Sequence, residues 1–316
     1  MPDIARPAPS TTTAPDRAWL AYLMLTTTML MWSGNFIIGR GLRDILSPAS
    51  FSLWRWLLTA LLVAPFAWPH LKRQWPIMLR HWRILLLLSI LMVSIGNTLT
   101  YYSLESTTAI NAALVNAVQP VVMVVIAWLL DRDAVTPLQG LGIVLSLIGV
   151  VTVVGRADLG VILALRFNIG DLWMFVAVIS FSFYAVIHRR APRDIHPLCL
   201  LQTIALVGGI FVIPTWLGEW AAGTARMSVT AEAMAAFLYI SLCASFLAIL
   251  FWNRGLAIVG PNRAGVFIYL LPVFSSVLSI VLLDEHVRPY HLVGFAFIIV
   301  GIYVTTRLAA RRRAGA

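Results

Sequence analysis

Residues 112–149 read AALVNAVQPVVMVVIAWLLDRDAVTPLQGLGIVLSLIG, and residues 264–301 read AGVFIYLLPVFSSVLSIVLLDEHVRPYHLVGFAFIIVG. The two stretches share their alanine, prolines and glycines at an offset of 152 residues, in the pairs Ala112/Ala264, Pro120/Pro272, Pro137/Pro289, Gly142/Gly294 and Gly149/Gly301. Nearer the N-terminus the offset is 149, in the pairs Ser33/Ser182, Arg40/Arg189, Pro48/Pro197 and Pro65/Pro214. A loop of different length in the two copies explains the change of three. Duplicated hydrophobic halves are typical of transporters built from structural repeats, with the substrate site between the halves.

The composition indicates a membrane protein. Hydrophobic residues make up 60% of the chain and charged residues only 11%, and the mean hydropathy is +0.88. A soluble domain could not cover so much apolar surface with so few charges. The net charge of +10 does not indicate nucleic-acid binding, because the basic residues form short clusters between apolar runs.

The apolar runs predict ten transmembrane spans, because about 20 apolar residues cross the hydrocarbon core as a helix. The runs are near this length and lack sustained alternation, which favours helices over a β-barrel. We therefore expect an all-α membrane protein with a disordered cytoplasmic tail at 1–17, a first repeat at 18–156, a second repeat at 169–307 and a basic tail at 308–316. The predicted spans are 18–39, 48–67, 84–104, 107–130, 137–155, 169–188, 197–217, 233–253, 261–283 and 289–307.

The distribution of Lys and Arg predicts the orientation. With both termini in the cytoplasm, 16 of the 23 basic residues lie on the cytoplasmic side and six on the outer side, while Arg55 lies within a span. This bias follows the positive-inside rule. Because each half has an odd number of spans, the halves are expected to have opposite orientations, as in inverted-topology repeats.

The chain resembles the drug/metabolite transporter superfamily, in particular its EamA-type members with two five-helix repeats. The resemblance rests on the run Trp32-Ser33-Gly34-Asn35-Phe36, on Pro48 with Arg55, and on the duplicated proline and glycine pattern described above. It covers residues 18–307, and Asp133 stands where the first repeat of the family usually has Glu. The resemblance implies a ten-helix carrier with a central cavity that works by alternating access in a bacterial inner membrane. It also implies export of small metabolites, with amino acids, aromatic or neutral, as leading candidates.

Polar and aromatic side chains within the spans are the candidate substrate contacts, because such groups in hydrocarbon face the bundle interior or a water-filled cavity. Amides within spans also hydrogen-bond neighbouring helices without touching a substrate, and aromatic residues near span ends also form interfacial belts, so both interpretations stay open. The candidate substrate-binding residues are Trp32, Asn35, Asn97, Tyr101, Asn116, Gln119, Tyr184, Tyr239, Trp252 and Tyr269.

Four further residues are candidates for gating. Pro120 and Pro272 occupy matched positions in the two halves, where an interior proline removes a backbone hydrogen bond, so they are either paired hinges or static kinks. Arg55 lies about 10 Å along its helix from Pro48, at 1.5 Å per residue. It either extends to the outer interface or pairs with Asp171, at the start of the sixth span, as part of an outer gate.

The sequence places all 13 acidic residues in loops, in tails or at span ends. Because proton-coupled carriers commonly use an intramembrane carboxylate or histidine, we expect a facilitator or exchanger with an uncharged cavity. A drug or nucleotide-type metabolite carrier is the alternative, and a membrane-embedded enzyme or a channel is an alternative of another class. The sequence shows no catalytic constellation, and we expect no metal, no cofactor and no obligate protein partner, only a small-molecule substrate and the lipid bilayer.

Overall fold

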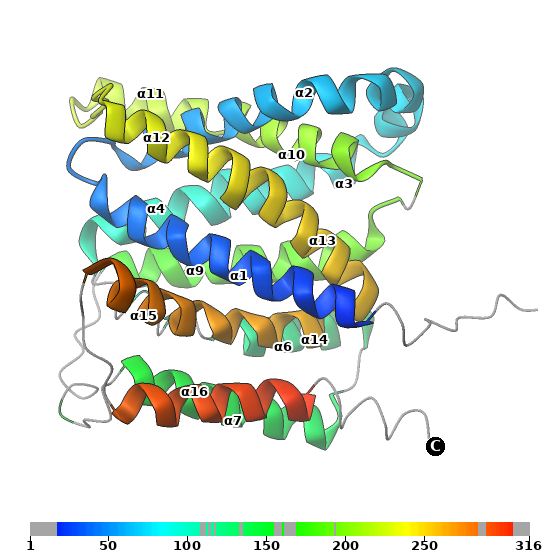
Figure 1. Cartoon of the computed structure of the whole chain (residues 1–316). Coiled ribbons are helices and arrows are strands. Elements are labelled where there is room, and N and C mark those ends of the chain that lie inside the picture. The colour runs from blue at the N-terminus through cyan, green and yellow to red at the C-terminus, as the bar shows by residue number, and fades with distance from the viewer. Residues whose placement is uncertain are drawn as a thin grey trace, which may run out of the picture.

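The protein is a bundle of helices that run along one common direction (Figure 1). The computed structural model describes residues 18–107, 112, 115–116, 118–132, 135–154, 160, 169–192, 194–283 and 289–305. The predicted tails and Asp133 lie outside the described residues. Within them the structure is helical, and the extended pairing consists of one isolated bridge between Leu46 and Met227.

In the described part of the chain, each predicted span overlaps a helix or consecutive helical segments, and for the span 107–130 this helix is Gln119–Asp131. The first half contains α1 (Ala18–Gly41), α2 (Pro48–Arg80), α3 (Trp82–Ser89), η2 (Ile90–Asn97), α4 (Thr98–Ser106), α6 (Gln119–Asp131) and α7 (Pro137–Val154). The second half contains α9 (Ile169–Ile187), η3 (His188–Arg190), α10 (Pro197–Ile210), α11 (Ile213–Ala221), α12 (Ala231–Tyr239), η4 (Ile240–Leu247), α13 (Ala248–Val259), α14 (Pro261–Ala264), η5 (Gly265–Tyr269), α15 (Leu270–Leu283) and α16 (Pro289–Tyr303).

Prolines set where several of these helices begin. Pro48, Pro137, Pro197, Pro261 and Pro289 each occupy the first position of a helix. The missing N–H of proline is unpaired at this position in any case, and its fixed φ is already helical. The shared prolines of the two halves are therefore explained in large part as helix starts.

The second predicted span is longer than expected. The sequence predicted an end at residue 67, before Pro69 and the polar residues that follow, but α2 continues to Arg80 with three prolines inside it. Most positions over residues 68–80 are exposed or half-buried, Lys72 and Arg73 among the exposed ones, while Met78 is buried. The helix therefore continues beyond the apolar stretch that predicted the span.

The proline pair Pro120 and Pro272 lies at the beginnings of helices. Pro120 is the second residue of α6, and Pro272 is the third residue of α15, directly after the 3₁₀ segment η5. Neither proline breaks the middle of a regular helix. In the second half the change of helix type precedes the proline, so the irregular backbone is at Gly265–Tyr269.

Close packing of α7 against α16 involves the glycines shared by the two copies. A Cβ atom at Gly142 would lie 2.6 Å from the carbonyl oxygen of Gly301, and one at Gly301 would lie 2.5 Å from that of Gly142. A Cβ atom at Gly149 would lie 2.5 Å from the carbonyl oxygen of Gly294. These contacts pair low residue numbers on α7 with high numbers on α16, so the two helices are antiparallel. Small residues at such positions allow the backbones to approach.

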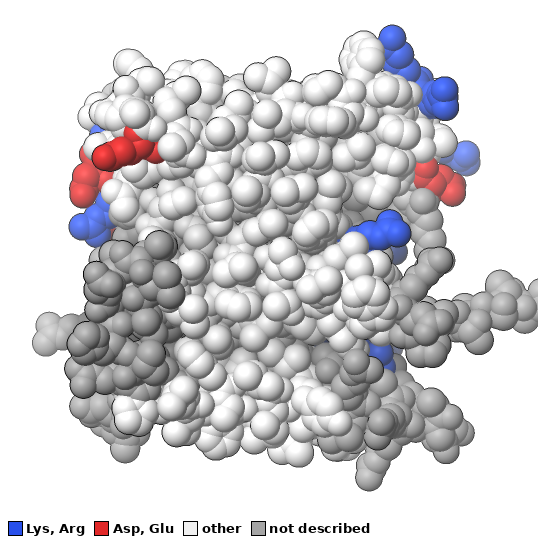
Figure 2. All heavy atoms as spheres, in the orientation of Figure 1, with Lys and Arg blue, Asp and Glu red and all other residues white. Residues whose placement is uncertain are grey.

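The surface fits a bilayer. Six helices in the described chain are long and apolar enough to cross a membrane, and α6, α7 and residues 292–303 are shorter apolar helices. Large apolar side chains such as Leu61 (69% exposed) and Trp220 (62% exposed) lie on the outside. Figure 2 shows charged side chains toward the two ends of the bundle and an uncharged middle on this face. The chain is a multi-pass membrane protein.

Candidate functional site

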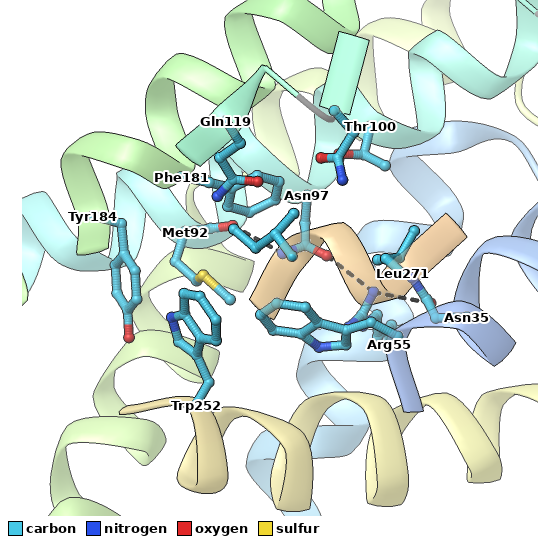
Figure 3. Close-up of a pocket in the computed structure, with 13 residues that line it drawn as sticks. Asn35, Arg55, Met92, Asn97, Thr100, Gln119, Phe181, Tyr184, Trp252 and Leu271 are labelled. Atoms are coloured by element: carbon cyan, nitrogen blue, oxygen red, sulfur yellow. Dashed lines mark hydrogen bonds between the residues drawn. The ribbon is translucent and has the colours of Figure 1, made fainter. Parts of the chain in front are cut away.

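A cavity lies inside the bundle, between helices of the two halves (Figure 3). Its volume is about 60 Å³, on a measure by which one water molecule takes about 10–15 Å³. It therefore holds a few waters or a small part of a solute. The residues that line it are Trp32, Asn35, Arg55, Met92, Asn97, Thr100, Asn116, Gln119, Phe181, Tyr184, Trp252, Ile268 and Leu271.

Most of the predicted substrate contacts meet in this cavity, although they come from distant parts of the chain. They are Trp32, Asn35, Asn97, Asn116, Gln119, Tyr184 and Trp252. Three predicted residues are not part of the lining. Tyr101 lies behind it and binds Arg55. Tyr239 packs against α1, where its hydroxyl donates to the carbonyl of Met31 at 3.3 Å. Tyr269 is buried in a separate apolar cluster that includes Val266 and Val273.

Arg55 is the charged residue of the cavity wall, and only 2% of its surface is exposed. Its Nε donates to the hydroxyl of Ser245 at 2.7 Å. Its Nη1 donates to Asn97 Oδ1 at 2.9 Å, to the Tyr101 hydroxyl at 2.5 Å and to Asn35 Oδ1 at 3.2 Å. Every one of these acceptors is neutral.

The predicted pair between Arg55 and Asp171 is wrong. The Asp171 carboxylate, near the start of α9, accepts a hydrogen bond from the Thr107 hydroxyl, whereas Arg55 donates to residues of α1, η2, α4 and η4. Both residues lie toward the same end of their helices, but position along a helix does not give the direction around it. The expectation of an uncharged cavity is also wrong, because the arginine lines it.

Two π-helical segments, one from each half, supply hydrogen-bond acceptors to Arg55. Asn97 ends η2, and Ser245 lies within η4. The two segments begin at Ile90 and Ile240, at matching places in the two halves. Wider π turns shift side chains around the helix axis and are frequent at functional sites. The amide of Asn97 donates to the Met92 carbonyl at 2.9 Å, so its Oδ1 is directed to the guanidinium.

The cavity is covered on one side by packed aromatic rings. Phe51, one turn before Arg55 on α2, packs on Tyr101 with ring centroids 4.5 Å apart and on Phe237 at 5.4 Å. All three side chains are buried. They separate the arginine from the end of the bundle that carries the α1–α2 turn.

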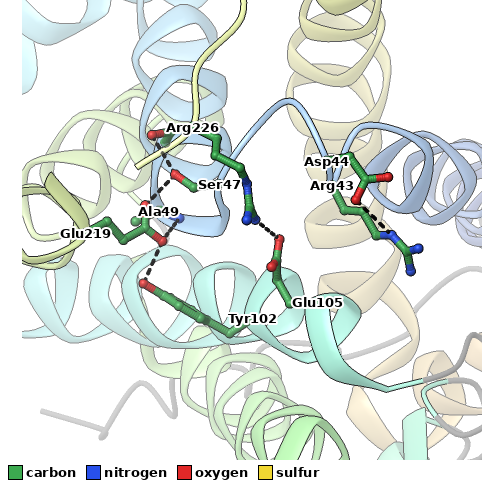
Figure 4. Close-up of polar contacts among 9 residues, drawn as sticks. Arg43, Asp44, Ser47, Ala49, Tyr102, Glu105, Glu219 and Arg226 are labelled. Atoms are coloured by element: carbon green, nitrogen blue, oxygen red, sulfur yellow. Dashed lines mark hydrogen bonds and ion pairs between the residues drawn. The ribbon is translucent and has the colours of Figure 1, made fainter. Parts of the chain in front are cut away.

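At that end, a buried carboxylate joins the two halves (Figure 4). Glu219 of α11 accepts hydrogen bonds from the Ser47 hydroxyl at 2.5 Å, the Ala49 amide at 3.0 Å and the Tyr102 hydroxyl at 2.8 Å. The ion pair between Arg226 and Glu105, at 2.6 Å, lies beside it. The sequence prediction missed this cluster, because Glu219 falls just beyond the predicted span and Tyr102 has the position of an interfacial aromatic.

The opposite end of the bundle has a different set of contacts. The rings of His70 and His196 stack with centroids 3.8 Å apart, and burial together with the charge of His70 lowers the pKa of His196. Asp131 pairs with Arg190 at 2.7 Å and with Arg189 at 3.4 Å on the surface. The cavity thus lies between two ends that are each closed by contacts between the halves.

Comparison with known proteins agrees with this architecture. The model of the EamA-like transporter family matches residues 19–155 and again residues 168–307. The chain belongs to this family. The two matches also show that the family unit occurs twice, which confirms the duplication read from the sequence.

The relatives of this EamA chain are transporters by name. It is 30% identical over 290 residues to an uncharacterized transporter of Archaeoglobus fulgidus, which covers 90% of this chain and 96% of the relative. It is 24% identical over 284 residues to the uncharacterized transporter YyaM of Bacillus subtilis, covering 89% and 92%. A solved crystal structure superposes with a TM-score of 0.74 at 20% identity, over 93% of this chain and 98% of that one, which supports the fold.

Proposed function

We propose that this membrane transporter works by alternating access and exports small polar metabolites, with amino acids as the leading class, across a bacterial inner membrane. The observation that carries the proposal is the central cavity, lined by both halves and set between two closed ends. Its amide groups suit polar substituents, and its aromatic surface suits an apolar body. Such mixed lining is typical of small-molecule sites.

An inverted relation of the ten spans is part of the proposal. The contact between Gly142 and Gly301 maps onto the contact between Gly294 and Gly149 when 152 residues are added to each Gly of α7 and subtracted from each Gly of α16. Ser146, which donates to the Ile298 carbonyl at 3.5 Å, maps onto its own partner. Contacts that exchange in this way are those expected near a two-fold axis, and they support halves of opposite orientation.

The charge bias supports an orientation with both termini in the cytoplasm. The cluster around Glu219 would then close the outer side, and the stacked histidines would lie on the cytoplasmic side. Rocking of one repeat against the other would break these two sets of contacts in turn.

Counterflow into liposomes that contain the purified chain tests the proposal, with panels of amino acids, nucleosides and sugars. We expect exchange of one or more amino acids. Equal rates with and without a pH gradient would support a facilitator or exchanger, because the cavity lining in the described chain includes no Asp or Glu. No response to any of the three classes would refute the transport proposal and favour a channel or an enzyme.

A drug or nucleotide-type carrier is the second candidate. Phosphate groups are commonly bound by several cationic side chains, whereas the described cavity lining has Arg55 alone. This observation favours substrates with at most one negative charge at that point.

A further inference from the structure

The charge of Arg55 has no counter-ion in the described chain. A guanidinium stays protonated in proteins, and all the acceptors around this one are amide, hydroxyl or carbonyl oxygens. Burying a cation without an anion is costly, even when neutral acceptors surround it.

One nitrogen of Arg55 has hydrogen-bonding capacity left. Nη2 carries two N–H groups and has a single contact, to the Ala244 carbonyl at 3.5 Å. That carbonyl already accepts a shorter bond of 3.0 Å from the Trp32 indole. Nη1, in contrast, has three acceptors for two N–H groups. The guanidinium is therefore held firmly on one side and poorly satisfied on the other.

The rest of the cavity lining indicates the chemistry of the remainder of an anionic solute. Trp32 and Trp252 lie with ring centroids 5.3 Å apart, and Phe181, Met92 and Leu271 add apolar surface. Arg55 and Asn35 lie on one side of the cavity, and Tyr184 and Trp252 on the other (Figure 3). The site is thus cationic at one end and aromatic at the other.

We infer that Arg55 binds the carboxylate of the transported solute, so that the substrates are small monocarboxylates with an apolar or aromatic body. The inference rests on the proposed transport function and names the chemical class that the cavity selects. A single guanidinium balances one negative charge, and its planar N–H groups match the two oxygens of a carboxylate.

The decisive experiment compares each acid with its carboxamide in the wild-type chain. Proteoliposomes are loaded with an amino acid that exchanges in the panel above. Entry of labelled phenylalanine, leucine and 3-phenylpropionate is measured against phenylalaninamide, leucinamide and 3-phenylpropionamide. We expect each amide to compete about tenfold or more weakly than its acid, the difference that a charge-assisted hydrogen bond makes. Equal competition by acid and amide would overturn the inference.

Substitutions then locate the selectivity. Arg55→Gln should bring the acid-to-amide ratio close to one, and Arg55→Lys, which keeps the charge and loses the planar fork, should give an intermediate ratio. Arg43→Gln is the matched control, because Arg43 is half exposed and pairs with Asp44 at the end of the bundle. It should leave the ratio unchanged. A retained ratio in a folded Arg55→Gln would overturn the inference.

Two outcomes separate the inference from the transport proposal. Exchange of nucleosides or sugars without a preference for acids would leave the transporter intact and refute the carboxylate site. Absence of exchange for every solute would refute the transport function itself. If the Arg55 variants do not fold, as shown by melting in detergent, the acid-to-amide ratio of the wild type decides alone.

Discussion

The packing of α7 against α16 makes a quantitative prediction about Gly142→Ala. The added Cβ atom would lie 2.6 Å from the Gly301 carbonyl oxygen and 2.9 Å from the Thr305 backbone nitrogen. Ordinary contact begins at 3.4 Å, so α16 must move away by about 0.8 Å to accept it. The Thr305 hydroxyl lies closer still, but the two backbone atoms cannot rotate away as a side chain can, and the helices must therefore separate.

The expected cost follows from two opposing terms. Overpacking of this kind costs about 1–3 kcal/mol, whereas Gly→Ala in a helix interior gains about 1 kcal/mol from propensity. Gly140 lies in the same helix, and a Cβ atom there would have nothing within 4 Å. Gly140→Ala therefore has the gain in helix propensity without the overpacking, and the difference between the two variants gives the overpacking cost. Gly140→Ala should therefore be neutral or stabilising. The two variants should differ by about 1–3 kcal/mol.

Thermal melting of purified protein in detergent, followed by fluorescence and by loss of the monodisperse peak, provides the assay. Gly142→Ala should melt below the wild type or close to it, and clearly below Gly140→Ala. Gly301→Ala should behave like Gly142→Ala, since its Cβ atom would lie 2.5 Å from the Gly142 carbonyl. Equal melting temperatures for Gly142→Ala and Gly140→Ala would show that the close helix contact does not exist.

Three further predictions concern the two ends of the bundle. Glu219→Gln replaces a buried acceptor of three hydrogen bonds, so it should cost about 1–3 kcal/mol, measured as a lower melting temperature. Acidification should loosen the contact between His70 and His196, because the pKa of His196 is lowered: stability that is present above the ordinary value of about 6.5 is lost as the pH falls. The protection factors for hydrogen exchange at the start of α10, corrected for the pH dependence of intrinsic exchange, should therefore be lower at pH 5 than at pH 7.5. Asp131→Asn removes exposed ion pairs and should change stability by less than about 1 kcal/mol, with no effect in high salt.

The sequence predicted where most helices of the described chain lie, because a membrane requires long apolar runs and prolines mark several helix starts. It also predicted that polar side chains such as Asn35, Asn97 and Asn116 would meet, since burial in a bundle leaves them few other places. Direction around the helix axis was harder to predict. Tyr269 ends a 3₁₀ segment, η5, whose 3.0 residues per turn rotate each residue about 20° further than an α-helix does. Over Gly265–Tyr269 this adds about 100°, enough to carry a side chain to another face.

The π-helical segments likewise made the neighbours of Arg55 difficult to predict from the sequence. Its partner Ser245 lies in η4, and nothing in the sequence around Ile240–Leu247 distinguishes a π-helix from an α-helix. The prediction of a pair with Asp171 used distance along the helices alone. A charge within a span could be recognised from the sequence, but the residues around it depended on backbone irregularities that only the structure revealed.

Two residue pairs at equivalent positions of the halves, Ser47 with Glu219 and His196 with His70, lie at the two ends of the bundle. Ser47 and His196 each precede the first residue of a helix and are 149 residues apart, and His70 and Glu219 are also 149 residues apart. Ser47 contacts Glu219, and His196 contacts His70, so the same pair of positions closes both ends. One end uses a hydroxyl and a carboxylate, and the other uses two imidazoles. Because burial lowers the pKa of His196, acid on the histidine side should weaken one closure and leave the geometry of the other intact. Equivalent positions of the two halves thus form contacts at both ends, and the residue types at these positions make the two contacts respond to different conditions.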